Sequence, residues 1–412
     1  MPSRYLSFRC SVTWFILLLE TLFLIHFLLC FPDVGGIYSP SSLYPEFQDV
    51  NHMVIFGFGF FLMVLRRYGF SSTGLNFLLI VLGVQCCVVV EDLLVFLRMQ
   101  QDEGGMRSLA KALVSMTAVA ISTGAVLGKA NPLQLIVMSL VELIIFYVSK
   151  CINRTFLQVP DHLTLMHVHL FGAYFGVAVT SRFPEAPPGL DKNRSTPKSE
   201  LFSMLGTVFV WVFWPSFNSL LADSKKEAVL NTYLALAVSA VAAFMLSALT
   251  SKDGKFRMTH IHSAVLAGGV TVSYTAHSIQ HPWIAMILGL LGSVITILGS
   301  HCLQRCFNPA FKLQDTSGVH FTFGLPAVLG AVAAVVLRVI EEGISSRWNN
   351  LSSLGYLVFV DVGAFCQTIS TALLTGLITG LILNIKLLKT VHVSKYFDDQ
   401  CYWEFPHLSV GF

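Results

Sequence analysis

The chain has 412 residues, of which 54% are apolar and only 12% are charged, and its mean hydropathy is +0.70. A soluble protein of this length needs about twice that share of charged residues to cover its surface, so the composition excludes a soluble fold and predicts a membrane protein. The net charge of +3 does not indicate nucleic-acid binding. The nine cysteines form no CxxC pair or zinc-like spacing, so no metal or cofactor is predicted.

Apolar segments of about the 20 residues that span a bilayer recur along the whole chain. The first is about twice as long as the core of a signal peptide, and we expect it to stay as a membrane helix. Helices are favoured over barrel strands because the apolar runs lack a period of two. The twelve predicted spans are 12–31, 51–67, 74–97, 108–128, 131–150, 162–181, 201–221, 228–249, 259–279, 283–303, 318–341 and 354–385.

An even number of spans places both termini on one side of the membrane. With residue 1 in the cytoplasm, most of the 26 Lys and Arg residues fall in cytoplasmic segments, as the positive-inside rule requires. Residues 1–11 then form a cytoplasmic N-terminus, 12–386 the membrane domain and 387–412 a cytoplasmic tail. Asn350 begins an outer Asn-Leu-Ser sequon and is a candidate glycosylation site.

Two stretches share one pattern. Asp161 is followed eight residues later by His169, and Asp315 is followed eight residues later by Phe323. The two predicted helices run in opposite directions, which is typical of an inverted repeat with its functional site near the membrane midplane. Each acid lies at a helix start, where capping of free backbone N–H groups is the favoured interpretation.

His169 is the most informative residue of the pattern. At 1.5 Å per residue it lies roughly 12 Å along the helix from Asp161, near the centre of a ~30 Å hydrocarbon layer. Ionisable residues at that depth usually face a cavity or a partner. Two interpretations remain open: a neutral histidine bonded within the core, or a pore-lining histidine opposite Phe323. His320, one turn before Phe323, is placed to reach the same space.

The densest aromatic cluster runs from Trp211 to Phe217. Membrane-interface anchoring is the simpler interpretation for Trp211 and Trp214. The alternative is an aromatic vestibule whose ring faces hold a small cation, with Phe217 in it.

Small residues also follow a pattern. Gly172 with Gly176, and Gly376 with Gly380, have the small-xxx-small spacing that predicts close helix packing. A single cysteine near the basic N-terminus, Cys10, is a weak lipidation signal. Three intramembrane acids have no partner that the sequence reveals: Glu20, Glu142 and Asp361.

Several long stretches carry a family likeness: Gly124–Lys129, His169–Gly176, Phe213–Ser219, His262–Val270 and the tail from Lys395 to Phe412. By these the chain resembles the Rh (Rhesus) proteins of the ammonium transporter superfamily, and within them the non-glycosylated blood-group type. The resemblance implies an all-α membrane protein with an inverted five-helix repeat and eleven core helices plus one. It also implies a trimer with a narrow apolar pore in each subunit.

The resemblance assigns roles to individual residues. Conducting members recruit ammonium outside, remove its proton and pass ammonia along two facing histidines behind two stacked phenylalanines. Here His169 matches the first histidine and Phe217 one gate ring, whereas Phe323 stands in the second histidine's place and Val114 in that of the other ring. Two of four pore features are therefore missing. The family's acids are matched by Asp161 and Asp315.

Two functions follow as alternatives. One is a poorly conducting or non-conducting subunit of a red-cell plasma-membrane Rh complex. It would assemble with Rh-associated glycoprotein-type subunits and attach through its tail to a membrane-skeleton adaptor such as ankyrin. The other is a working channel for ammonia, ammonium or a neutral gas. Phe323 favours the first, because its ring neither donates nor accepts a hydrogen bond. No nucleotide loop or nucleophile–base motif predicts an enzyme.

Overall fold

The computed structural model describes residues 4–30, 43–99, 105–186, 191–300, 315–345, 351–388 and 390–405. Within them every regular element is a helix, which confirms the predicted fold class. Asn350 lies outside the described residues, as does the side chain of Cys10. The main helices are α1 (Arg4–Cys30), α2 (Tyr44–His52), η2 (Met53–Gly57), α3 (Phe58–Phe61), α4 (Gly69–Phe96), α5 (Gly105–Ala125), α6 (Pro132–Phe156), α7 (Asp161–Met166), α8 (Val168–Thr180), α9 (Pro197–Ser219), α10 (Lys225–Thr250), α11 (Met258–Thr271), α12 (Pro282–Leu298), η5 (His320–Gly324), α14 (Leu325–Ser345) and α15 (Leu351–Leu383).

In the described part of the chain, nine helical segments are long and apolar enough to cross a membrane. Each of the twelve predicted spans coincides with a helix or a run of helices. α11 and α12 are shorter, at 14 and 17 residues. The predicted span 51–67 is divided between the end of α2, η2 and α3, where a turn of π-helix precedes Phe58.

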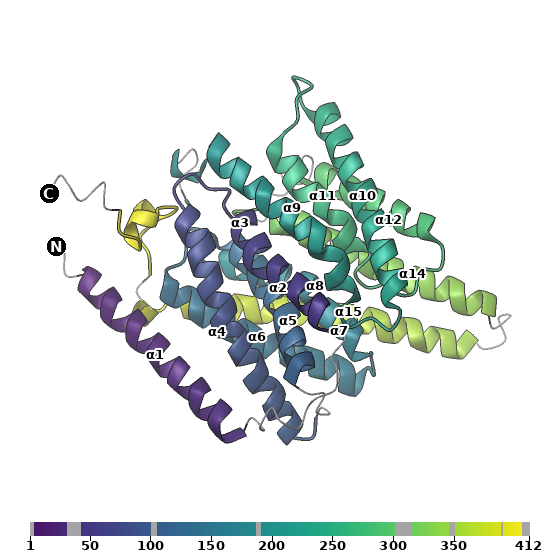
Figure 1. The fold of residues 1–412 in the computed structure, drawn as a ribbon, viewed down its shortest axis with the longest axis horizontal. Coiled ribbons are helices and arrows are strands. Elements are labelled where there is room, and N and C mark those ends of the chain that lie inside the picture. The colour runs from purple at the N-terminus through teal and green to yellow at the C-terminus, as the bar shows by residue number, and fades with distance from the viewer. Residues whose placement is uncertain are drawn as a thin grey trace.

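The helices form one bundle, with α1 along one side and the α14–α15 hairpin extending at the opposite side (Figure 1). The start of α1, in purple, and the C-terminal tail, in yellow, lie at the same end of the picture. We call this end the tail face.

The tail is bound to the bundle at the start of α4. The Asp399 carboxylate accepts hydrogen bonds from the backbone N–H groups of Phe70 and Ser71, at 2.8 and 2.9 Å. The indole N–H of Trp403 donates to the Ser71 hydroxyl at 2.9 Å. Since the first N–H groups of a helix have no partner within it, Asp399 supplies the cap that α4 itself lacks.

A second set of contacts binds the tail to Gly128 and Lys192. Phe397, only 1% exposed, donates its backbone N–H to the Gly128 carbonyl at 2.9 Å. Lys192, in the segment between the two halves of the chain, lies 2.7 Å from the Asp398 carboxylate. The tail therefore connects the first half of the bundle with the segment that leads to the second half.

Small residues hold α8, the helix that carries His169, close to its neighbours. A Cβ atom on Gly172 would lie 2.4 Å from the Ala118 carbonyl oxygen of α5. A Cβ atom on Gly376 of α15 would lie 2.7 Å from the Phe175 carbonyl oxygen. Only glycine fits at these distances, so the predicted close packing is confirmed and α8 is held between α5 and α15.

Candidate functional site

The two residues singled out by the repeated pattern lie next to each other. His169 of α8 and Phe323 of η5 are both fully buried, with ring centroids 6.5 Å apart and planes 11° apart. Neither ring nitrogen of His169 makes a hydrogen bond of normal geometry, although the Met166 carbonyl interacts with the ring. A buried polar group without a partner is costly, so the environment of His169 differs from that of a structural core histidine.

Trp214 joins this pair, so the simpler of the two sequence interpretations, anchoring at a membrane interface, was wrong for this residue. Trp214 is fully buried instead of lying at a membrane interface. Its ring stacks on His169 at 5.5 Å and on Phe323 at 6.5 Å. Phe217 lies 5.6 Å from His169 and 6.0 Å from Trp214. The available signal was the i, i+3 spacing, which puts Trp214 on the helix face of Phe217.

Val114 and Phe217 form no stacked pair, because Val114 has no ring. Val114 is fully buried on α5, one turn after Lys111. Phe217 takes its ring contacts from His169 and Trp214 instead.

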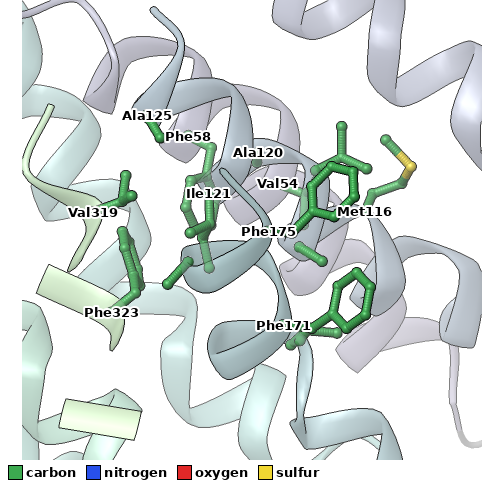
Figure 2. Packing of buried hydrophobic residues seen from close by; sticks show 14 of the residues in the cluster. Val54, Phe58, Met116, Ala120, Ile121, Ala125, Phe171, Phe175, Val319 and Phe323 are labelled. Atoms are coloured by element: carbon green, nitrogen blue, oxygen red, sulfur yellow. The ribbon is translucent and has the colours of Figure 1, made fainter. Parts of the chain in front are cut away.

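Two further rings pack against Phe323. The rings of Phe58 and Phe61 each lie 5.9 Å from that of Phe323. All three side chains are at most 1% exposed, and Figure 2 shows Phe323 and Phe58 in the same apolar cluster. We call Phe58, Phe61 and Phe323 the aromatic plug. It offers no hydrogen-bond donor or acceptor.

A second imidazole lies on the other side of the plug. His262 of α11 stacks on Phe61, with centroids 3.9 Å apart and planes 11° apart. Its Nδ1 lies 2.8 Å from the Ser203 hydroxyl and 3.1 Å from the Thr207 hydroxyl. From the sequence it stood out only as the first residue of a family-like stretch, because nothing local indicates that Phe61 covers it.

Asp161 does not cap its helix, contrary to the sequence interpretation. It is the first residue of α7, but the start of this helix has no side-chain cap. The carboxylate instead lies 2.5 Å from Nζ of Lys111 on α5 and 3.6 Å from Nζ of Lys150 on α6. Both lysines are nearly fully buried, at 1% and 2% exposure. The attraction of two buried cations outweighs the capping of one helix end.

Asp315 does cap, as predicted. Its two carboxylate oxygens accept the backbone N–H groups of Gly318 and His320, at 2.9 and 2.8 Å. The His320 ring lies against Tyr174 of α8, at 5.8 Å, and no ring contact joins it to His169 among the described residues. The two copies of the motif therefore use their acids differently.

The three intramembrane acids whose partners the sequence did not reveal each bind one neighbour. Those partners are Ser122 for Glu142, Gln85 for Glu20 at 3.3 Å, and Arg338 for Asp361 at 3.1 Å.

A cavity of about 520 Å³ reaches His262 from the tail face. It is lined by the first turns of α9 and α11 and by residues 315–318. The cavity and His169 lie on opposite sides of the aromatic plug, because His262 stacks on Phe61 and Phe61 contacts Phe323.

This geometry defines a class of protein: a multi-pass helical membrane protein with a buried line of aromatic and imidazole rings through its centre. Residues 14–400 match the model of the Ammonium Transporter Family, and the chain belongs to this family.

Its relatives are Rh polypeptides. An RH-like protein of Macaca mulatta and the blood group Rh(D) polypeptide of Rattus norvegicus are each 40% identical to the chain, with complete coverage of both sequences. The human blood group Rh(CE) polypeptide is 39% identical over 96% of this chain and 94% of its own length. The resemblance to Rh proteins of the blood-group type is therefore confirmed.

Solved structures agree. Rh50 of Nitrosomonas europaea, described with the mechanism of conduction by the Rhesus family of channels, has a TM-score of 0.76 at 26% identity, covering 89% of this chain and 93% of that one. Mep2 of Saccharomyces cerevisiae has a TM-score of 0.65 at 14% identity, with 87% and 89% coverage. The second comparison shows the shared fold alone.

Proposed function

We propose that the protein is a subunit of a trimeric Rh-type complex that conducts ammonia poorly or not at all, with a structural role in assembly at the red-cell plasma membrane. The observation that carries this proposal is the aromatic plug. Phe323 occupies the place where the Rh likeness leads us to expect a second pore histidine, and Phe58 and Phe61 pack against it.

The energetics of the plug support low flux. An ammonium ion at the bilayer centre costs at least ~2.5–3.5 kcal/mol. Neutral ammonia avoids that cost but still gives up hydrogen bonds to water, and leaving a polar group without a partner costs about 1–3 kcal/mol. His169 offers one partner, whereas three rings without polar atoms offer none. With these rings at most 1% exposed, no water-filled route passes between them.

The proposal places the tail face in the cytoplasm, on the basis of the basic residues. Residues 1–11 and 387–412 are then cytoplasmic, and 12–386 form the membrane domain. The partners in the trimer are Rh-associated glycoprotein-type subunits, and the tail attaches to an adaptor such as ankyrin. Because Phe397 and Asp399 are already bound to the bundle, the adaptor meets the exposed part of the tail or displaces it.

Co-purification tests the assembly role. Mild detergent extraction from red-cell membranes should recover the protein with a second Rh-type chain at the mass of a trimer. Recovery of free monomer alone, under conditions that preserve other membrane complexes, would contradict the proposal.

The second candidate function, a working ammonia channel, is favoured by the buried His169 ring that lacks normal hydrogen bonds. Liposomes that contain the protein, loaded with a pH-sensitive dye, separate the two functions after an external ammonium jump. We expect the internal pH to rise no faster than in empty liposomes. A clearly faster rise would establish the channel instead.

Replacing Phe323 by His tests the plug itself. Phe323→His should raise the flux above that of the wild type, because it restores a hydrogen-bonding group beside His169. Phe321→His is the matched control: Phe321 is on the same short helix but lines the tail-face cavity and is not part of the plug. If folded Phe323→His protein conducts no better than Phe321→His, the block lies elsewhere.

A further inference from the structure

We propose that the tail-face cavity is a binding site for a small organic cation that carries N–H donors, of the primary diamine class. The site goes beyond the proposed function, because it concerns a ligand that is retained and not one that crosses the membrane.

The cavity has the size and closure of a ligand site. Its volume of about 520 Å³ falls within the ~300–1,000 Å³ of small-molecule pockets, and far exceeds what a single ammonia molecule needs. Its inner end is formed by His262, which is stacked on Phe61 of the plug. A molecule that enters from the tail face therefore meets a closed end.

The hydrogen bonds around His262 indicate which of its ring nitrogens carries the proton. The Ser203 hydroxyl donates to the Phe61 carbonyl, and the Thr207 hydroxyl donates to the Ser203 carbonyl, each at 2.9 Å. With its one proton given to a carbonyl, each hydroxyl oxygen is left to accept from Nδ1 of His262, which lies 2.8 and 3.1 Å away. The geometry thus assigns the proton to Nδ1 and leaves Nε2 as an acceptor.

Nε2 of His262 has no hydrogen-bond partner in the protein, and the residue is 5% exposed. A buried acceptor of this kind is satisfied only by a ligand or water that donates a proton. A primary ammonium group supplies three N–H donors. A carboxylate or a quaternary ammonium supplies none.

The cavity lining offers two carboxylates to a cation. Those of Glu200 and Asp315 line it, with the guanidinium of Arg257 in the same lining and the Lys129 ammonium near Asp315. The Asp315 carboxylate accepts backbone N–H groups from Gly318, Val319 and His320, and its roughly four lone-pair sites leave room for one further donor. His260 lines the same wall and already contacts the Thr250 hydroxyl at 3.4 Å. Apolar walls for a methylene chain come from Val64, Met258 and Phe321.

Calorimetry on the full-length protein in detergent, with putrescine as the probe, tests the inference. We expect saturable binding of putrescine, and binding of tetramethylammonium weaker by about tenfold or more, since it has charge but no N–H donor to pair with Nε2. Equal binding of the two cations by the wild type would overturn the proposal. Binding of glutarate that is tighter than that of putrescine would also overturn it, because the site would then prefer an anion.

A pair of variants locates the contact. His262→Phe keeps a ring on Phe61 but removes Nε2, so putrescine binding should fall by about tenfold. His277→Phe changes a histidine outside this cavity, where it contacts His162, and should leave binding within about twofold. Equal losses in both variants, or no loss in His262→Phe, would refute the assignment. These measurements involve no flux, so their failure leaves the liposome result unaffected.

Discussion

Removing the charge of Asp161 is predicted to cost more stability than removing that of Lys111, although the two form one ion pair. In Asp161→Asn, two cations that are 1% and 2% exposed lose the carboxylate that pairs with both, and Glu91 is the acid that remains near them. In Lys111→Met, Asp161 keeps Lys150 at 3.6 Å. The difference follows from one carboxylate shared by two buried cations and would not arise in an isolated pair.

The structure sets the scale of each effect. Removing one partner of a buried ion pair costs about 3–5 kcal/mol, and we expect Asp161→Asn to fall in this range. Lys111→Met leaves one interaction in place and should cost about 1–3 kcal/mol. The double variant should be more stable than the sum of the two losses implies, by about 0.5–3 kcal/mol, because one of the two cations that lost the Asp161 carboxylate has been removed.

Unfolding in mixed micelles, followed by tryptophan fluorescence, measures these free energies. Lys150→Met is the matched control, since it removes the more distant cation of the same carboxylate and should be milder than Lys111→Met. The reasoning fails if Lys111→Met proves as destabilising as Asp161→Asn, because Lys150 would then contribute nothing to Asp161.

Two further predictions concern the packing of the bundle and the tail. Gly172→Ala should lower stability by about 1–3 kcal/mol, since its Cβ would lie 2.4 Å from a carbonyl oxygen. Gly355→Ala, whose Cβ would have nothing within 4 Å, should be neutral. Equal melting temperatures for the two variants would contradict the close packing at Gly172. Asp399→Ala should destabilise the capped start of α4 by about 0.5–2 kcal/mol and speed limited proteolysis of the tail. Gln400→Ala is the control at an exposed neighbouring residue. If Asp399→Ala is cleaved no faster than Gln400→Ala, Asp399 does not hold the tail on the bundle.

The fold could be predicted from the sequence because a bilayer leaves few choices. Apolar runs of span length with few charges must form helices, so all twelve segments have helical counterparts. Segment 51–67 was predicted only as one span. Its division into three elements depends on α9: a Cβ atom on Gly206 would lie 2.0 Å from the Phe61 nitrogen. A contact between residues that far apart leaves no local signal.

The candidate site was only partly predictable from the sequence. The repeated spacing pointed to His169 and Phe323, which are in contact. Trp214 and His262 were missed because their roles depend on neighbours from other helices. Asp161 was misread as a cap because Lys111 lies on another helix and nothing near Asp161 in the sequence indicates it.

The docked tail has a consequence for modification by kinases. Tyr396 is fully buried, and its hydroxyl has no partner among the described residues. A kinase active site must surround the hydroxyl that it phosphorylates, and it has no access here while Phe397 and Asp399 remain bound. Phosphate on this tyrosine would therefore mark the molecules whose C-terminal segment has been released.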